Sequence, residues 1–203
     1  MTHTWNYLPI TPEQEEVSQH LAQELGINPI LCRLLAERGI KSAAAAKKFF
    51  RPQLPDLHDP FLMKDMDVAV DRLNRAMGRK ERILIYGDYD VDGTTAVALV
   101  YKFIQQFYSN IDYYIPDRYN EGYGVTTKGV DYAASTGVGL VIVLDCGIKA
   151  VEEIAYAKSK GIDFIICDHH VPDDVLPEAV AILNAKREDN TYPYEHLSGC
   201  GVG

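Results

Sequence analysis

From residue 82 onward, short apolar runs alternate with stretches whose apolar residues recur at helical spacing. The apolar runs are RILIYG (82–87), DYYIP (112–116), GLVIVLDCG (139–147), DFIICDHH (163–170) and EAVAILN (178–184). Stretches of helical period lie between them, such as TTAVALVYKFIQQF (94–107) and AVEEIAYAKSKG (150–161). Apolar strands that alternate with helices are typical of a parallel sheet covered on both faces. The sequence therefore predicts an α/β fold with a parallel sheet of about five strands and helices on both faces.

The first 80 residues predict helices and no strands. Thr11 is suited to cap a helix that starts with Pro12 and ends at Gly26. Further helices are expected over residues 28–39, 42–50 and 63–77, and the proline-rich stretch 51–61 is expected to be an irregular connector. We therefore expect a small helical N-terminal region over residues 1–80 and an α/β domain over residues 81–203.

Composition places the chain among globular proteins. It has 203 residues, of which 47% are hydrophobic and 24% charged, and no apolar run reaches the roughly 18 residues that a membrane span requires. The first 16 residues lack the basic and apolar regions of a secretory signal. The four cysteines show no CxxC spacing, which favours reduced thiols. These features predict a cytoplasmic protein with no membrane partner.

The acidic residues are unevenly distributed. Residues 1–80 carry eleven basic and ten acidic side chains, whereas residues 81–203 carry nine basic and nineteen acidic ones. An acidic domain is unusual for a protein that binds nucleic acid, because such proteins normally present basic surfaces to phosphates. The objection is removed if several of the acids bind divalent cations, which invert the local field.

The segment YGDYDVDGTTA (86–96) places Asp88, Asp90 and Asp92 at alternate positions. Like charges this close raise each other's energy unless a cation neutralises them. One alternative is a solvated turn in which Asp92 caps the next helix. Another is a calcium loop of the EF-hand type, but Leu99 stands where that loop requires a bidentate acid, and a strand precedes the segment instead of a helix. A metal site therefore explains the segment best.

Other acids and two histidines follow neighbouring predicted strands. Asp145 ends the third strand, and Asp168, His169 and His170 end the fourth. Asp145 alone could be a helix cap, and the histidine pair alone could serve packing. Because the carboxyl ends of parallel strands meet at one edge of the sheet, we expect all these groups to converge there with the aspartates of residues 88–92.

Carboxylates combined with imidazoles favour Mn²⁺ or Mg²⁺ over metals that prefer thiolates. Cys146 and Cys167 adjoin the expected ligands, so zinc stays open, although both thiols are interpreted as small apolar fillers. Several carboxylates around a shareable Asp145 suggest two divalent cations. Hydrolysis of a phosphoester or a phosphoanhydride is the chemistry that such a pair of ions normally performs.

Three motifs in this order resemble those of a known family. DYDVDG, VLDCG and CDHH are similar to the first three motifs of the DHH phosphoesterase superfamily. Three longer stretches resemble its branch of bacterial RecJ single-stranded-DNA-specific exonucleases. These are LHDPFLMKDMDVAVDRL (57–73), YIPDRYNEGYGV (114–125) and LSGCGVG (197–203), the last being similar to the start of a glycine-rich fourth motif.

The resemblance implies a set of metal ligands, which are Asp90, Asp92, Asp145 and His169. Asp145 would bridge two Mn²⁺ or Mg²⁺ ions, and Asp90 and Asp92 would each hold one of them. His169 would complete the shell of the second ion. Tyr86 stands where some members place a histidine ligand, which implies a first ion that is held less tightly or through water.

The resemblance also implies three catalytic residues. Asp88 would be a carboxylate near the metal shell, Asp168 would orient the ring of His169, and His170 would stabilise charge on the scissile phosphate.

A third set would bind the DNA strand, namely Arg118 and the turn that contains Gly122, Tyr123 and Gly124. The alternative for Arg118 is a surface ion pair with Asp117 or Glu121.

The activity implied is 5′→3′ exonucleolytic hydrolysis of single-stranded DNA in recombination and repair. Single-stranded DNA would be the substrate, with single-strand-binding protein and a helicase as possible protein partners. The family also uses a later aspartate and further domains, so we expect the 203 residues to be a truncated piece with little or no activity alone. The alternatives are a DHH hydrolase of oligonucleotides, cyclic dinucleotides or pyrophosphate, and a non-catalytic DHH scaffold.

Overall fold

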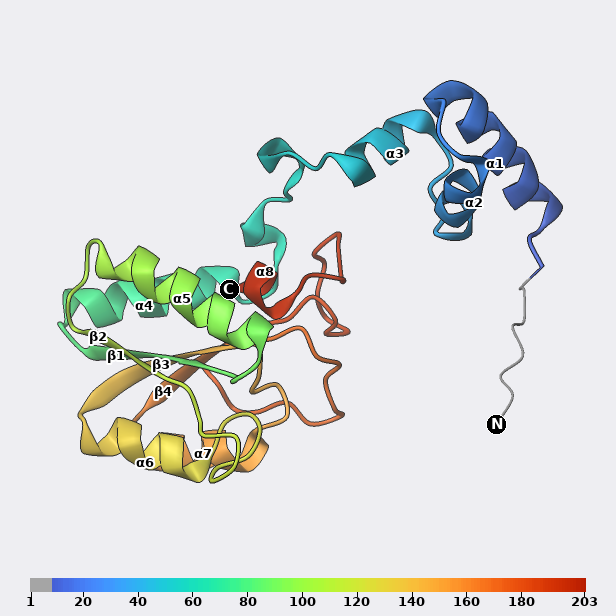
Figure 1. Ribbon diagram of the computed structural model, residues 1–203. Helices are drawn as coiled ribbons and strands as arrows, with labels where there is room; N and C mark the ends of the chain where they lie inside the picture. Colours follow the sequence, from blue (N-terminus) through green and yellow to red (C-terminus); the bar gives the residue numbers. More distant parts are fainter. Residues whose placement is uncertain (1–8) are drawn as a thin grey trace, which may run out of the picture. The chain divides into compact units, whose positions relative to one another are not determined.

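The computed structural model describes residues 9–203 and divides the chain into two compact units, one ending at Leu57 and one running from His58 to Gly203 (Figure 1). Residues 1–8 lie outside the described residues. The predictions for this stretch, that it starts the helical region and that it lacks a secretory signal, are therefore not addressed by the structure. Among residues 9–203, no helix combines the length and the apolar character needed to cross a lipid bilayer.

The first unit consists of helices, as predicted. They are α1 (Pro12–Leu25), α2 (Pro29–Glu37), α3 (Ala43–Phe50) and the short 3₁₀ helix η1 (Leu54–Asp56). Thr11 caps α1 by accepting a hydrogen bond from the backbone N–H of Gln14, and Gly26 ends the helix at a φ of 64°. A small core contains Leu21, Cys32 and Leu35.

The second unit begins with η2 (Pro60–Leu62) and α4 (Met66–Gly78). The apolar face of α4 packs into the core of the sheet. Arg72 of this helix is buried, and its guanidinium lies 2.6 Å from both Glu81 and Asp163, which flank the starts of two strands. The structure therefore divides after Leu57, whereas the sequence suggested a boundary after residue 80, because α4 is tied to the sheet by packing and by ion pairs.

The rest of the second unit alternates strands and helices. The strands are β1 (Arg82–Gly87), β2 (Ile111–Tyr114), β3 (Val138–Leu144), β4 (Asp163–Cys167) and β5 (Ala181–Leu183). The helices are α5 (Val91–Gln105), α6 (Thr127–Ser135), α7 (Val151–Ser159) and α8 (Gly199–Val202). The strands pair in the order β2-β1-β3-β4-β5, and every pair is parallel. The predicted α/β fold with a five-stranded parallel sheet is confirmed.

Helices cover both faces of this sheet (Figure 1). On one face, α4 and α5 pack against a core that includes Ile83, Ile85 and Leu144. On the other, α6 and α7 pack against a core that includes Leu84, Val141 and Ile166. Successive residues of each strand point to opposite faces, so strands covered on both faces must be apolar throughout. This accounts for the uninterrupted apolar runs in the sequence.

The strand order creates a switch point between β1 and β3. The chain leaves β1 through α5 to reach β2 on one side, and returns through α6 to β3 on the other side. In open parallel sheets, ligands bind beyond the carboxyl ends of the strands at such a point. The residues after β1 and β3 are therefore the first place to look for a site.

Candidate metal centre

Four polar residues follow four neighbouring strands at equivalent positions. Gly87, Leu144, Cys167 and Leu183 are aligned across β1, β3, β4 and β5. The next residues are Asp88, Asp145, Asp168 and Asn184, and each is at most 1% exposed. Parallel pairing therefore places three carboxylates side by side at the edge of the sheet, as the sequence predicted. Asn184 was not recognised from sequence, although it follows the apolar run AVAIL in the same way.

Asp88 is a buried carboxylate without a hydrogen-bond partner for either oxygen among the described residues. Burial raises its pKa and the charge of Asp90 adds to this effect, whereas the nearby backbone N–H groups of Tyr89, Asp90 and Gly124 oppose it. The backbone around it is tightly packed, since a side chain on Gly93 would lie 2.5 Å from the Asp88 carbonyl oxygen. A buried carboxylate without a hydrogen bond of good geometry is costly, and a bound cation would reduce that cost.

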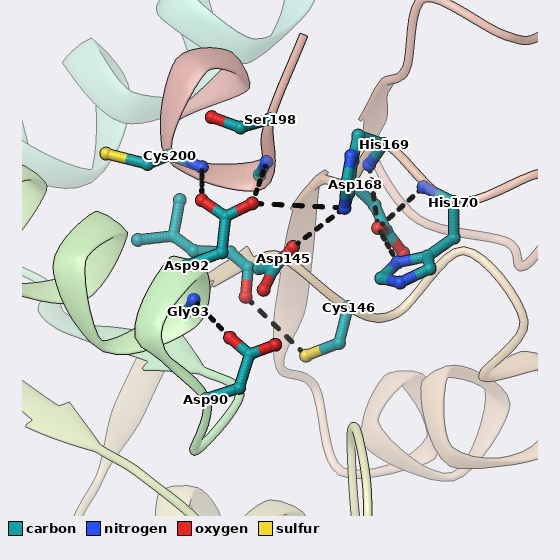
Figure 2. Close-up of polar contacts among 12 residues, drawn as sticks. Asp90, Asp92, Gly93, Asp145, Cys146, Asp168, His169, His170, Ser198 and Cys200 are labelled. Atoms are coloured by element: carbon teal, nitrogen blue, oxygen red, sulfur yellow. Dashed lines mark hydrogen bonds and ion pairs between the residues drawn. The ribbon is translucent and has the colours of Figure 1, made fainter. Parts of the chain in front are cut away.

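The other two acids of this segment lie at the start of α5. Asp90 is the N-cap of the helix, and its Oδ1 accepts a hydrogen bond of 2.9 Å from the backbone N–H of Gly93. The capping role considered for Asp92 belongs to Asp90, two residues earlier. The carboxylate of Asp92 instead accepts two backbone hydrogen bonds of 2.7 Å, from Gly199 and Cys200 (Figure 2).

Asp145 lies at the centre of the cluster (Figure 2). Its backbone has a φ of 63°, an uncommon conformation for a residue other than glycine. Burial, followed by the charges of Asp92 and Asp90, raises the pKa of this carboxyl group to about 7. Its Oδ1 lies 3.2 Å from Nε2 of His169. A strained, buried carboxyl group in an acidic surrounding is the kind of group that a functional site retains.

His169 presents one ring nitrogen to the carboxylates. Its Nδ1 lies 3.0 Å from the carbonyl oxygen of Leu197, which can only accept, so Nδ1–H is the donor. The lone pair of Nε2 in the neutral ring then faces Asp145 and, at 4.0 Å, Oδ2 of Asp92. This tautomer is suited to metal coordination, because the second nitrogen of a liganding histidine usually donates to a carbonyl or a carboxylate.

Asp168 orients the ring of His170 and not that of His169, which corrects the expectation from sequence. Its Oδ1 accepts 2.7 Å hydrogen bonds from the backbone N–H of His169 and from the ring Nδ1 of His170. Its Oδ2 accepts from the backbone N–H of Ile148 at 3.0 Å. The ring of His169 turns toward the carbonyl group of Leu197, so the Asp168 carboxylate binds the ring of His170 instead. Nε2 of His170 lies 3.4 Å from the hydroxyl of Tyr123.

The possible ligand atoms form two groups that share one residue. Asp88, Asp90 and Asp145 offer ligand atoms within 4.8 Å of one another, and so do Asp145, His169 and His170. The donors are carboxylate oxygens and imidazole nitrogens, which suit Mn²⁺ or Mg²⁺. Among the described residues neither group contains a cysteine, which argues against thiolate ligands. Burial raises the pKa of the Cys146 thiol well above its ordinary value and that of Cys167 to about 12. The residues therefore fit two divalent cations that share Asp145.

Tyr86 stabilises the fold near this centre. Its buried hydroxyl donates to the carbonyl oxygen of Gly124 at 2.9 Å and accepts from the backbone N–H of Thr126 at 3.2 Å. The ring stacks on Tyr114. Tyr86 belongs to neither group of possible ligands found among the described residues.

The predicted DNA-binding residues lie on the loop before α6. Arg118 makes no ion pair within 4.0 Å in the part of the chain that the structure describes, and its guanidinium lies over the ring of Tyr89 at 5.3 Å. The alternative of an ion pair with Asp117 or Glu121 is therefore wrong. Gly122 and Gly124 have φ values of 90° and 80°, and the exposed ring of Tyr123 between them borders a pocket of about 300 Å³ beside His170.

Comparison with known proteins agrees with this geometry. A sequence model described as the DHH family, N-terminal domain, matches residues 82–203. The chain belongs to the DHH family. The predicted membership of the DHH superfamily is confirmed.

Within the DHH family the chain is similar to RecJ proteins. It is 41% identical over 191 residues to the single-stranded-DNA-specific exonuclease RecJ of Bacillus subtilis strain 168, which covers 94% of this chain and 24% of that protein. It is 35% identical over 190 residues to the protein of the same name from Escherichia coli strain K12, covering 93% of this chain and 32% of that one. The chain thus spans about a quarter to a third of the length of these curated relatives.

A solved structure, that of an exonuclease RecJ bound to manganese, superposes with a TM-score of 0.64 and 29% sequence identity. The alignment covers 72% of this chain and 37% of the solved chain. Manganese in that relative is a cation of the kind that the donor atoms of this DHH-family chain fit.

Proposed function

We propose that this chain is part of a RecJ-type exonuclease that hydrolyses phosphodiester bonds of single-stranded DNA from the 5′ end with two Mn²⁺ or Mg²⁺ ions. The observation that carries the proposal is the pair of ligand groups that share Asp145 at the aligned ends of the strands. Similarity to proteins named as single-stranded-DNA-specific exonucleases supports the substrate.

Each ion would take ligands from these groups, with Asp92 from outside them added to the second. Asp88 and Asp90 would hold the first ion together with Asp145, which would make Asp88 a direct ligand and not only a neighbour of the shell. Asp145 would also hold the second ion, together with His169 and with Asp92, whose Oδ2 lies 4.0 Å from Nε2 of His169. When bound, the two ions polarise the phosphoryl oxygens and lower the pKa of an attacking water molecule.

His170 and the loop before α6 act on the substrate. Nδ1 of His170 is held by Asp168, which leaves Nε2, 3.4 Å from the hydroxyl of Tyr123, for the substrate. When the ring carries a proton on both nitrogens, Nε2–H can donate to a phosphate oxygen as charge develops there. Arg118, which has no carboxylate partner among residues 9–203, is free to pair with a DNA phosphate. The turn that contains Gly122, Tyr123 and Gly124 would contact the phosphates of the same DNA strand. The ring of Tyr123 lies beside His170.

The acidity of the second unit is consistent with this proposal. Two divalent cations would neutralise four carboxylate charges of the site, so that the phosphates no longer meet the net negative charge of these acids. Single-strand-binding protein and a helicase stay the predicted protein partners, and the cytoplasm stays the predicted location.

The test is hydrolysis of a 5′-labelled single-stranded oligonucleotide by the protein that contains this chain, with and without Mn²⁺. The proposal predicts release of labelled mononucleotides from the linear strand only, with a duplex and a circular single strand left intact. Asp145→Ala should abolish the reaction. Hydrolysis of a cyclic dinucleotide or of pyrophosphate, with the single strand left intact, would instead assign the site to a small-substrate phosphoesterase. No hydrolysis of any of these substrates would favour a scaffold.

A further inference from the structure

The segment from Leu197 to Cys200 contacts the metal centre through backbone atoms. The backbone N–H groups of Gly199 and Cys200 donate to the two carboxylate oxygens of Asp92, each at 2.7 Å. The carbonyl oxygen of Leu197 accepts from Nδ1 of His169 at 3.0 Å. Figure 2 shows the carboxylate of Asp92 between this segment and Asp145. One short turn therefore holds two of the proposed ligands of the second ion in their orientations.

The same turn lies directly against the third of these ligands. A Cβ atom added to Gly199 would lie 2.0 Å from Oδ1 of Asp145 and 2.4 Å from its Cγ. Real Cβ atoms essentially never approach other heavy atoms below 3.0 Å. Asp145 cannot easily retreat, because it is 1% exposed and its backbone N–H is bonded to the carbonyl oxygen of Cys167. The absence of a side chain at residue 199 is thus what lets the turn and the carboxylate occupy adjacent positions.

A neighbouring glycine in the turn has no such constraint. A Cβ atom on Gly201 would lie 3.3 Å from Oγ of the exposed Ser198, which a small shift of that side chain can relieve, and 3.6 Å from Leu197, an ordinary van der Waals distance. Neither Gly199 nor Gly201 is among the glycines with positive φ in the described chain. The two positions therefore differ in their contact with Asp145 and not in backbone strain.

We propose that Leu197–Cys200 is a backbone clamp that positions Asp92, Asp145 and His169 for the second ion, with Gly199 as its positioning residue. The clamp uses one lone pair of each Asp92 oxygen and fixes the His169 tautomer, leaving Nε2 and the remaining carboxylate lone pairs for the cation. Ligands held in this way lose little freedom when the ion binds. This inference rests on the proposed metal site and adds the element that orients it.

The first test compares Mn²⁺ binding by the chain and by two alanine variants, using isothermal titration. Groups that orient metal ligands typically contribute 10- to 100-fold in affinity, so Gly199→Ala should raise the Kd for Mn²⁺ by about that factor. Gly201→Ala, the matched control, should stay within about threefold of the unmodified chain by the same scale. Equal binding by Gly199→Ala and the unmodified chain would overturn the clamp. Absence of Mn²⁺ binding by the unmodified chain would instead count against the proposed function.

A second test needs no metal. Asp145→Gly removes the carboxylate that a side chain at residue 199 would meet, and glycine tolerates the φ of 63° found there. In metal-free protein, Gly199→Ala should lower the Tm in the original background and have little effect in the Asp145→Gly background. If Gly199→Ala prevents folding, adding Asp145→Gly should restore it. An equal loss of Tm in both backgrounds, or a double variant that also fails to fold, would overturn the proposal.

Discussion

Asp145→Asn should make the metal-free protein more stable while removing its ability to hold two ions. The substitution replaces a carboxyl group by a neutral group of the same shape, and asparagine adopts positive φ more readily than most residues. Asp145 is 1% exposed, and burial together with the charges of Asp92 and Asp90 raises its pKa to about 7. The carboxylate is therefore held in a place where its charge is unfavourable until a cation arrives.

The sign and size of the effect follow from this pKa. In the unfolded chain the carboxyl group titrates near its ordinary value of 3.8, whereas in the folded protein it keeps its proton up to about pH 7. Its contribution to stability is complete below pH 3.8 and is lost as the pH rises through 7. A difference of about three pKa units corresponds to about 4 kcal/mol. Asp145→Asn escapes this loss, so it should exceed the original protein in stability by up to about 4 kcal/mol above pH 8 and match it near pH 4.

Urea unfolding in the presence of a chelator measures this difference. Twelve of the 13 tyrosines lie in the second unit, so near-UV circular dichroism of tyrosine reports mainly the unfolding of the sheet. The free energy of unfolding should be measured at pH 4, 6 and 8, with Asp71→Asn, a change at an exposed carboxyl group on α4, as the control. Addition of Mn²⁺ should then stabilise the original protein much more than Asp145→Asn.

The reasoning is refuted if metal-free Asp145→Asn is less stable than the original protein at pH 8. It is also refuted if the difference between the two proteins does not change between pH 4 and pH 8. Either result would mean that the Asp145 carboxylate is stabilised by the protein alone and needs no cation.

Three further substitutions test other parts of the account. Arg72→Met should lower the free energy of unfolding of the second unit by about 3 kcal/mol, because it leaves Glu81 and Asp163 without their buried partner. An unchanged urea midpoint would contradict the claim that these ion pairs hold α4 against the sheet. Tyr86→Phe should cost about 1–2 kcal/mol of stability through two lost hydrogen bonds while leaving the Kd for Mn²⁺ unchanged, and a weakened Kd would make the hydroxyl part of the metal site. Asp168→Asn should lower kcat for DNA hydrolysis by about 10- to 100-fold, because it weakens the hydrogen bond that orients the ring of His170, and it should affect the Kd for Mn²⁺ less. A change in the Kd as large as the change in kcat would show that Asp168 orients the metal ligand His169 instead.

The sequence predicted the sheet because strands covered on both faces must be apolar throughout, and this signal is strong in β1, β3 and β4. The convergence of Asp88, Asp145 and Asp168 followed from the same topology, since the ends of parallel strands meet at one edge. The membership of α4 in the second unit was not predictable in this way. The spacing of Met66 and Leu73 marked an apolar face without showing which core would receive it.

Details of the site that depend on tertiary contacts were also beyond the sequence. The ring of His169 turns toward Leu197 and leaves Asp168 to His170, a choice decided by a carbonyl group almost thirty residues further along the chain. The positive φ of Asp145 and the close approach of Gly199 have no local signature in a sequence. The glycine-rich end of the chain indicated a motif, but only the fold shows that its backbone holds Asp92.

The most direct test of the account is the anomalous difference density of a crystal of this protein soaked in Mn²⁺. Two peaks are predicted about 3.5–4 Å apart. One should lie among Asp88, Asp90 and Asp145, and the other among Asp145, His169 and Asp92. No peak at the ends of β1 and β3, or a single peak that does not involve Asp145, would contradict the shared two-ion site.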